Sequence, residues 1–206
     1  LDGDRSSLAR LLSLIERGDD DARTVGRLAY PMSGSGYTVG LTGAPGAGKS
    51  TLTSSIIGHL RKQDLEVAVL AIDPSSPFTG GAILGDRVRM QDHATDPGVF
   101  IRSMATRGHL GGLSLATPEA VRLLDAIGRK WILVETVGVG QVEVEVAGKA
   151  DTTVVVVNPG WGDSVQANKA GLMEIADLFC VNKADLPGAE ATAHALEFAL
   201  QQRPTS

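Results

Sequence analysis

Short apolar runs alternate with helically spaced residues along most of this sequence. Six runs rich in Val and Ile predict strands at residues 38–42, 67–72, 99–103, 131–135, 153–157 and 178–182. Helical stretches between and after them lie at residues 49–62, 117–128, 164–176 and 189–201. The strands are mostly apolar on both faces, which is typical of a parallel sheet covered by helices on both sides. We therefore expect a doubly wound, mostly parallel α/β sheet.

The beginning of the chain follows a different pattern. Apolar residues at helical spacing predict a helix at residues 6–17, with Ser6 or Ser7 as its N-cap. A second short helix is expected after the acidic run that follows. The PMSGSG segment that comes next has the composition of a flexible joint. We divide the chain into an N-terminal helical appendage with its joint, residues 1–36, and a main domain, residues 37–206.

A glycine-rich loop, GAPGAGKS, follows the first predicted strand and fits G-x-x-x-x-G-K-[ST]. Glycines let successive backbone N–H groups converge on phosphate oxygens, and the next helix adds positive charge at its N-terminus. We expect Lys49 to reach the β- and γ-phosphates, the Ser50 hydroxyl to bind magnesium and Thr51 to contact the α-phosphate. The predicted nucleotide-binding residues of this loop are Gly43, Ala44, Pro45, Gly46, Ala47, Gly48, Lys49, Ser50 and Thr51. The loop indicates a sheet of the P-loop NTPase type.

An N-K-x-D sequence stands at the end of the last predicted strand. Asp185 is able to accept hydrogen bonds from the N1 and N2 groups of guanine, and adenine lacks that pair of donors. An unsatisfied buried carboxylate is costly, so this residue favours GTP and GDP over adenine nucleotides. Lys183 is expected to lie over the base, and Asn182 to hold neighbouring loops together.

Three acidic residues are candidates for binding magnesium. Glu135 follows the apolar strand at residues 131–134, where P-loop NTPases carry the acid that holds the metal. Asp73 ends the second strand and should face the metal as well. Asp86 follows in a Pro- and Gly-rich segment, where it either orients water and metal or caps a helix. Gly138 is expected to place its N–H near the γ-phosphate.

Lys49, Asp86 and Glu135 are therefore the predicted catalytic residues. Ras-like enzymes place a water-orienting Gln after the glycine of this loop, and here that position is Val139. We accordingly predict slow intrinsic hydrolysis that a partner or a loop closure accelerates.

The composition and charge of the chain exclude several functional classes. The net charge of −5 is unlike that of most nucleic-acid-binding proteins, and the single Cys180, expected in the core, excludes an intramolecular disulfide and a multi-cysteine metal cage. The apolar runs are shorter than the roughly 20 residues that span a bilayer, and the charged N-terminus is unlike a signal peptide. We expect a cytoplasmic protein that binds neither nucleic acid nor membrane.

These motifs together resemble the MeaB/MMAA/ArgK group of GTPases. The resembling blocks are GAPGAGKST, DPSSPFTGGAILGDRVRM, FIRSMATRGHLGGLS, ETVGVGQVEVEVA, GDSVQANKAGLMEIAD and VNKAD. The resemblance implies a G-protein chaperone that assists cofactor loading and protection of an adenosylcobalamin-dependent acyl-CoA mutase, typically methylmalonyl-CoA mutase. It also implies the roles given above for the residues that bind the phosphates, the magnesium and the guanine base. The loop that contains Asp163 and Lys169 corresponds to an additional switch of the family. Relatives continue past the N-K-x-D motif into a dimerisation arm, so a homodimer is implied for the full-length protein.

Other functions remain open on the sequence alone. A nickel-insertion GTPase of a related family would need Cys/His metal motifs. An ATP-dependent kinase, the activity that older names of relatives suggest, would lack N-K-x-D. A binding module with dead catalysis would not need the intact Lys49, Ser50 and Glu135.

Overall fold

The computed structural model describes residues 4–18, 20–73, 93, 95–105, 112–136, 140, 144–145, 147–161 and 169–202. Its six strands are β1 (Tyr37–Gly43), β2 (Val67–Asp73), β3 (Val99–Ala105), β4 (Trp131–Thr136), β5 (Thr152–Val157) and β6 (Leu178–Val181). Its helices are α1 (Arg5–Arg17), α2 (Asp20–Ala29), the 3₁₀ turn η1 (Tyr30–Met32), α3 (Lys49–Arg61), α6 (Gly112–Ala126), α9 (Lys169–Ile175) and α10 (Ala189–Gln201). Every predicted strand is present, with ends that differ by one or two residues.

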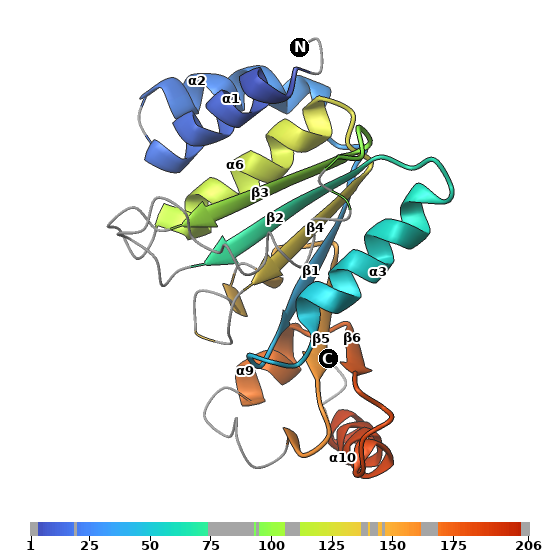
Figure 1. Cartoon of the computed structure of the whole chain (residues 1–206). Helices are drawn as coiled ribbons and strands as arrows, with labels where there is room; N and C mark the ends of the chain where they lie inside the picture. The colour runs from blue at the N-terminus through green and yellow to red at the C-terminus, as the bar shows by residue number, and fades with distance from the viewer. Residues whose placement is uncertain are drawn as a thin grey trace.

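The strands form one parallel sheet in the order β3-β2-β4-β1-β5-β6 (Figure 1). β1 lies in the middle, and the chain moves to one side of it for β2 and β3 and to the other side for β5 and β6. The carboxyl ends of β1 and β4 meet at the edge where parallel sheets of this kind bind ligands. The fold is therefore the doubly wound P-loop type that the sequence predicts.

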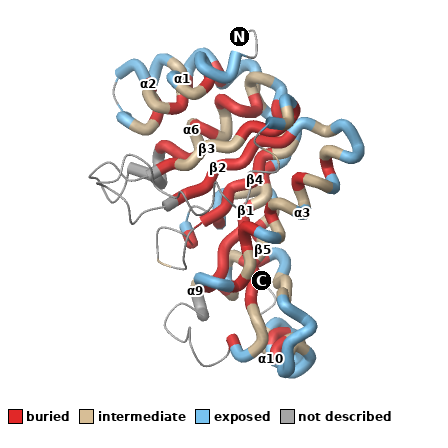
Figure 2. Tube along the Cα trace, in the orientation of Figure 1, coloured by how far each residue is buried: buried red, intermediate tan, exposed pale blue. Residues whose placement is uncertain are grey.

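Helices cover both faces of the sheet because the strands are apolar on both faces (Figure 2). On one face α3 packs Ile57 and Leu60 against Leu41, Val69 and other strand residues. On the other face α6 covers β2 and β4, and α9 and α10 share a smaller cluster with β5. Helix α6 begins at Gly112, ahead of the predicted start at residue 117, so Pro118 lies inside it. The predicted start was wrong because proline favours the first turn of a helix.

The two N-terminal helices share the core of the α6 face. Leu8, Leu12 and Ile15 of α1 are buried in the cluster that contains α6 and β2. The N-cap is Asp4, whose carboxylate accepts a hydrogen bond from the backbone N–H of Ser7 over 2.8 Å. The expectation of Ser6 or Ser7 as N-cap was wrong, because a carboxylate three residues before Ser7 reaches that donor and starts the helix earlier.

The predicted joint is held by one carboxylate of α6. Asp125 accepts hydrogen bonds from the backbone N–H groups of Gly34, Ser35 and Gly36, the last over 2.7 Å. Asp125 is itself buried, so the three donors compensate for the loss of its hydration. These contacts connect the end of the helical appendage to the same helix that supports the sheet.

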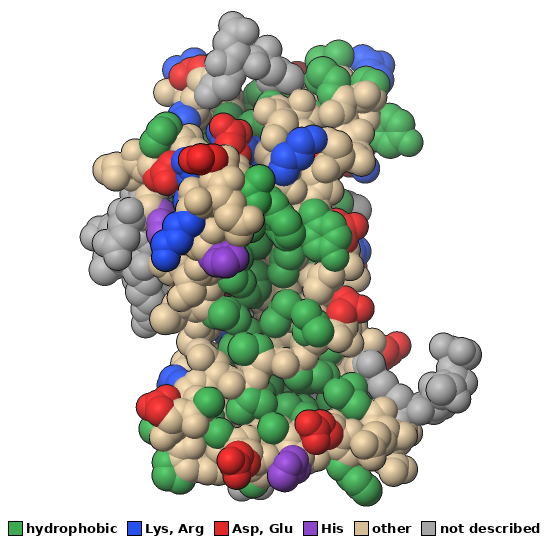
Figure 3. All heavy atoms as spheres, turned by 90° about the vertical axis from the view of Figure 1, so that its right-hand side faces the viewer, with side chains coloured by type: hydrophobic (Ala, Val, Ile, Leu, Met, Phe, Trp, Pro, Cys, Tyr) green, Lys and Arg blue, Asp and Glu red, His purple; other side chains and the backbone are tan. Residues whose placement is uncertain are grey.

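The α3 face of the sheet is less covered near β6. By register, Val154 and Leu178 lie on the face that carries Leu41, and Leu178 remains 57% exposed. Figure 3 looks onto this side and shows apolar side chains along it. Cys180 lies on the same edge strand and is half-buried, which corrects its expected place in the core. The exposure of this strand could not be predicted from the sequence pattern, because an edge strand can be as apolar as a central one.

Candidate nucleotide site

The glycine-rich loop connects β1 to α3 at the carboxyl edge of the sheet. Gly43, Gly46 and Gly48 have φ angles of 138°, 77° and 93°, values that residues with side chains rarely adopt. Ala44 and Ala47 are buried, whereas Pro45 and Gly46 are exposed at the tip, and Ala47 N–H donates to Ala44 O over 3.1 Å. The loop thus has the tight curvature that brings backbone N–H groups together in front of a helix N-terminus.

Lys49 begins α3 and is 7% exposed. Its Nζ donates hydrogen bonds to Gly43 O over 2.7 Å and to Ala44 O over 3.0 Å. The side chain therefore curls back along the loop that precedes it, so its ammonium group lies beside the loop backbone. A positive charge at that place suits an anion bound by the loop.

Ser50 and Glu135 meet between α3 and the end of β4. The Ser50 hydroxyl donates to Glu135 Oε1 over 2.6 Å, and Glu135 is 1% exposed. Its other oxygen, Oε2, accepts a hydrogen bond from Thr53 Oγ1 over 2.8 Å. Thr53 is not among the site residues predicted from the sequence. Its spacing of three residues from Ser50 on a predicted helix was the available signal, because residues i and i+3 share a helix face.

The N-K-x-D loop lies against the glycine-rich loop. Asn182 Nδ2 donates a hydrogen bond to Ala47 O over 2.8 Å, and its backbone N–H donates to Val157 O over 2.8 Å. A Cβ built on Gly48 would collide with the Asn182 amide, so only glycine fits there. Lys183 has φ of 55° and is exposed, as is Asp185. Thr51, at the first turn of α3, is exposed as well.

Two of the predicted site residues, Asp86 and Gly138, lie outside the described residues. Val139 and Asp163 lie outside them as well. Asp73 ends β2, two residues beyond Ala71, which pairs with Glu135, so its backbone lies at the same edge of the sheet. Its side chain is not described.

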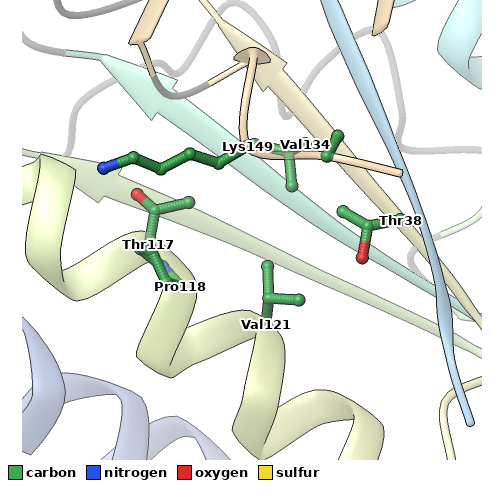
Figure 4. A pocket seen from close by; sticks show the side chains of 7 residues that line it. Thr38, Thr117, Pro118, Val121, Val134 and Lys149 are labelled. Carbon is green, nitrogen blue, oxygen red and sulfur yellow. The ribbon is translucent and has the colours of Figure 1, made fainter. Parts of the chain in front are cut away.

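A small cavity lies on the other face of the sheet, between α6 and the strands. Its volume is about 120 Å³, and it is lined by Thr38, Thr117, Pro118, Val121, Val134, Lys149 and Ala150 (Figure 4). Ordinary small-molecule pockets measure about 300–1,000 Å³, so this cavity does not hold a nucleotide. The cavity is thus separate from the cluster of Ser50, Thr53 and Glu135, which faces α3.

Within the part of the chain that the structure describes, no three His, Cys, Asp or Glu side chains gather as a metal cage. No described helix has the length and apolar character needed to cross a membrane.

A family model described as methylmalonyl Co-A mutase-associated GTPase MeaB matches residues 8–205. The chain belongs to this family. The match covers the glycine-rich loop, Glu135 and the N-K-x-D loop together, and it includes most of the N-terminal helices.

Individual relatives agree with the family match. The chain is 61% identical over 198 residues to a putative GTPase of Pyrococcus abyssi, covering 96% of this chain and 61% of that protein. It is 43% identical over 187 residues to GTPase ArgK of Escherichia coli, covering 89% of this chain and 56% of that protein. The chain thus spans about three fifths of the length of the curated relatives it matches.

A solved structure supports the fold. The crystal structure of a protein named LAO/AO transport system kinase superposes with a TM-score of 0.75 at 32% identity, covering 98% of this chain and 61% of that one. The doubly wound arrangement is common to both chains.

Proposed function

We propose that this chain is the nucleotide-binding part of a magnesium-dependent GTPase, converting GTP and water to GDP and phosphate. The observation that carries the proposal is the hydrogen bond from Asn182 to Ala47 O. It joins the loop that would read the base to the loop that would hold the phosphates. Family membership supports the same conclusion.

The glycine-rich loop, residues 43–51, is the proposed phosphate site. Its backbone N–H groups and the N-terminus of α3 favour bound phosphate. Lys49 Nζ lies beside Gly43 O and Ala44 O, from where a short rotation would bring it to the β- and γ-phosphates. The exposed Thr51 is proposed to contact the α-phosphate, and the N–H of Gly138 the γ-phosphate.

The donor set at the end of β4 fits magnesium. Mg²⁺ prefers hard oxygen ligands and is usually held by one or two carboxylates together with substrate phosphates. Ser50 and Glu135 supply a hydroxyl and a carboxylate 2.6 Å apart, and Asp73 and Asp86 are proposed to complete the protein's share. Bound magnesium would neutralise charge on the phosphates. Ser50 and Glu135 would orient it, with Asp86 and Glu135 also positioning the attacking water.

Asp185 is the proposed reader of the base. It follows Lys183, whose positive φ turns the chain sharply, and both side chains are exposed and therefore accessible to a ligand. Its carboxylate would accept from guanine N1 and N2, and Lys183 would lie over the ring. Asn182 would keep this loop at a fixed distance from the phosphate loop.

The biological role is proposed from the family. We infer that the full-length protein assists cofactor loading and protection of an adenosylcobalamin-dependent acyl-CoA mutase of the methylmalonyl-CoA type, acting as a cytoplasmic homodimer. The family description names the mutase association. Slow intrinsic hydrolysis, accelerated by the partner, remains part of this proposal.

Chromatography of reaction products tests the activity. With Mg²⁺, we expect the protein to release GDP from GTP and no ADP from ATP. Lys49→Ala should abolish turnover, and Glu135→Gln should lower it by about 100-fold or more, as when an electrostatic group of an active site is removed. Lys62→Ala, an exposed lysine just after α3, is the matched control and should change nothing. ATP turnover equal to that of GTP would contradict the proposal.

A separate binding experiment tests the partner. Purified methylmalonyl-CoA mutase should bind the immobilised full-length protein, with an affinity that differs between GDP and a non-hydrolysable GTP analogue. The hydrolysis rate of GTP should rise when the mutase is added. Equal hydrolysis with and without the mutase, and no retention in either nucleotide state, would refute the chaperone role while leaving the GTPase proposal intact.

A further inference from the structure

We propose that Thr53 is a positioning residue for Glu135: its hydroxyl holds the second carboxylate oxygen, so that the first remains on Ser50 where magnesium is to bind. The inference rests on the proposed GTPase function. Thr53 lies outside the P-loop motif, which ends at Ser50.

The spacing of the residues creates this contact. Ser50 and Thr53 are one turn apart on α3 and therefore share the face that packs on the sheet. In the register of the sheet, Glu135 pairs with Leu41 and Ala71, and Leu41 packs in the α3 cluster. The carboxylate thus enters between the two hydroxyls, each of which lies within hydrogen-bond distance of a different oxygen.

The proton of the Thr53 hydroxyl has two possible acceptors. Thr53 Oγ1 lies 3.0 Å from Lys49 O, the usual partner of a threonine within a helix, and 2.8 Å from Glu135 Oε2. A hydroxyl has one proton, and a carboxylate is the stronger acceptor because it is charged. The Thr53 hydroxyl therefore donates its hydrogen bond to Glu135 Oε2, the acceptor at the shorter of the two distances.

Two donors fix a carboxylate better than one. The contact of Thr53 with Oε2, added to that of Ser50 with Oε1, restrains both oxygens and therefore the plane of the group. The Ser50 hydroxyl donates its proton to Oε1, and a hydroxyl oxygen also has the lone pairs with which it binds a cation.

Removal of the Thr53 hydroxyl would therefore lower the affinity for magnesium through its effect on Glu135. Glu135 is 1% exposed and Thr53 is fully buried, so water does not readily replace the lost donor. Loss of this donor would leave Oε2 less restrained and so weaken the orientation of the carboxylate toward Ser50. Loss of an outer contact to a metal-binding group typically lowers metal affinity by about 10- to 100-fold.

The alternative is that Thr53 only packs. Two variants separate these roles. Thr53→Val keeps the shape and removes the hydroxyl, and Thr53→Ser keeps the hydroxyl and removes a methyl group. Ser55→Ala is the matched control, because Ser55 Oγ donates to Thr51 O over 3.0 Å on the exposed side of the same helix.

The experiment is calorimetric titration of GDP at a series of free Mg²⁺ concentrations and in EDTA, with thermal melts to verify folding. We expect Thr53→Val to need about tenfold more Mg²⁺ for its half-maximal effect on GDP affinity. Thr53→Ser and Ser55→Ala should behave as wild type, and GDP affinity in EDTA should be unchanged in all variants.

An unchanged Mg²⁺ midpoint in Thr53→Val would overturn the inference, as would an equal shift in Thr53→Ser. If Thr53→Val fails to fold, Thr53→Ala against Thr53→Ser gives the same comparison. The proposed function fails separately, when wild type binds ADP as well as GDP. In that case the Mg²⁺ midpoint, measured with either nucleotide, still decides the role of Thr53.

Discussion

The side-chain amide of Asn182 donates a hydrogen bond to the backbone carbonyl of Ala47 over 2.8 Å. The two residues are 135 positions apart and belong to different loops of the carboxyl edge. Because Ala47 is fully buried, water would not easily replace the Asn182 amide as the hydrogen-bond partner of its carbonyl if that amide were removed. The contact fixes the spacing between the proposed base and phosphate sites.

Asn182→Ala should therefore weaken both stability and nucleotide binding. We expect a loss of about 1–2 kcal/mol in the free energy of unfolding, measured by urea denaturation, since a buried acceptor loses its donor. GDP affinity should fall by about tenfold, because the two loops are no longer held together. Asn158→Ala is the control: among the described residues, Asn158 Nδ2 makes a long 3.5 Å contact to Pro159 O, and the change should affect neither quantity.

Gly48 tests the same junction from the other side. Gly48→Ala introduces a Cβ that collides with the Asn182 amide, at a residue with φ of 93°. Gly128 has φ of 92° and open space around it, so Gly128→Ala measures the backbone strain alone, about 1–2 kcal/mol. We expect Gly48→Ala to cost clearly more than Gly128→Ala in urea denaturation and to abolish GDP binding. Equal effects of the two substitutions would show that the collision is relieved without consequence.

A partly buried ion pair attaches the N-terminal helices to the sheet. Arg102 of β3 contacts Glu16 of α1 over 2.9 Å, and the side chains are 19% and 4% exposed. Glu16→Gln removes the charge that compensates Arg102, so we expect a loss of about 2–3 kcal/mol in unfolding free energy. Glu145→Gln is the matched control. Its exposed pair with Lys149 should contribute about 0.5 kcal/mol or less.

Local patterns predicted the strands well because strand and helix periodicities are properties of neighbouring residues. Lys49 and Ser50 were identifiable as candidates because their motif is contiguous, and the structure places them at the start of α3. Thr53 was not identified, because its contact with Glu135 joins residues 82 apart and depends on the packing of α3 on β4. The N-cap was missed for a simpler reason, since Asp4 competes with two nearby serines that are equally good caps by composition.

The extent to which helices cover the sheet edge could not be predicted from the sequence either. Cys180 and Leu178 lie in a run as apolar as any central strand, and burial depends on which helices pack above them. The contacts of Asp125 with residues 34–36 are of the same kind. A segment rich in Gly and Ser predicts a joint, and only the tertiary structure shows the carboxylate that holds it.

The stability should depend on pH through Asp96. A hydrogen bond from Arg61, followed by one from the backbone N–H of Gly98, lowers the pKa of Asp96 below its ordinary 3.8. Because the folded pKa is the lower one, the stabilisation is complete above pH 3.8 and is lost as the pH falls through the folded value.

Asp96→Asn should therefore lower the Tm at pH 7, and the difference from wild type should shrink in acid below the ordinary pKa. Thermal melts at pH 7, 4 and 3 measure this. Arg61→Gln removes the same interaction from the other partner and should give the same pH dependence. A difference in Tm that is constant with pH would show that the carboxylate charge is not responsible.

Calorimetric titration of GDP and ADP with Mg²⁺ tests most directly whether Asp185 reads the base. Asp185→Asn is the sharpest variant, because it keeps the size of the side chain and exchanges one carboxylate oxygen for an NH₂ donor. We predict that wild type prefers GDP by about 100-fold or more and that Asp185→Asn loses this preference while ADP affinity stays the same. Binding of ADP as tight as GDP by wild type, or an intact preference in the variant, would contradict the account.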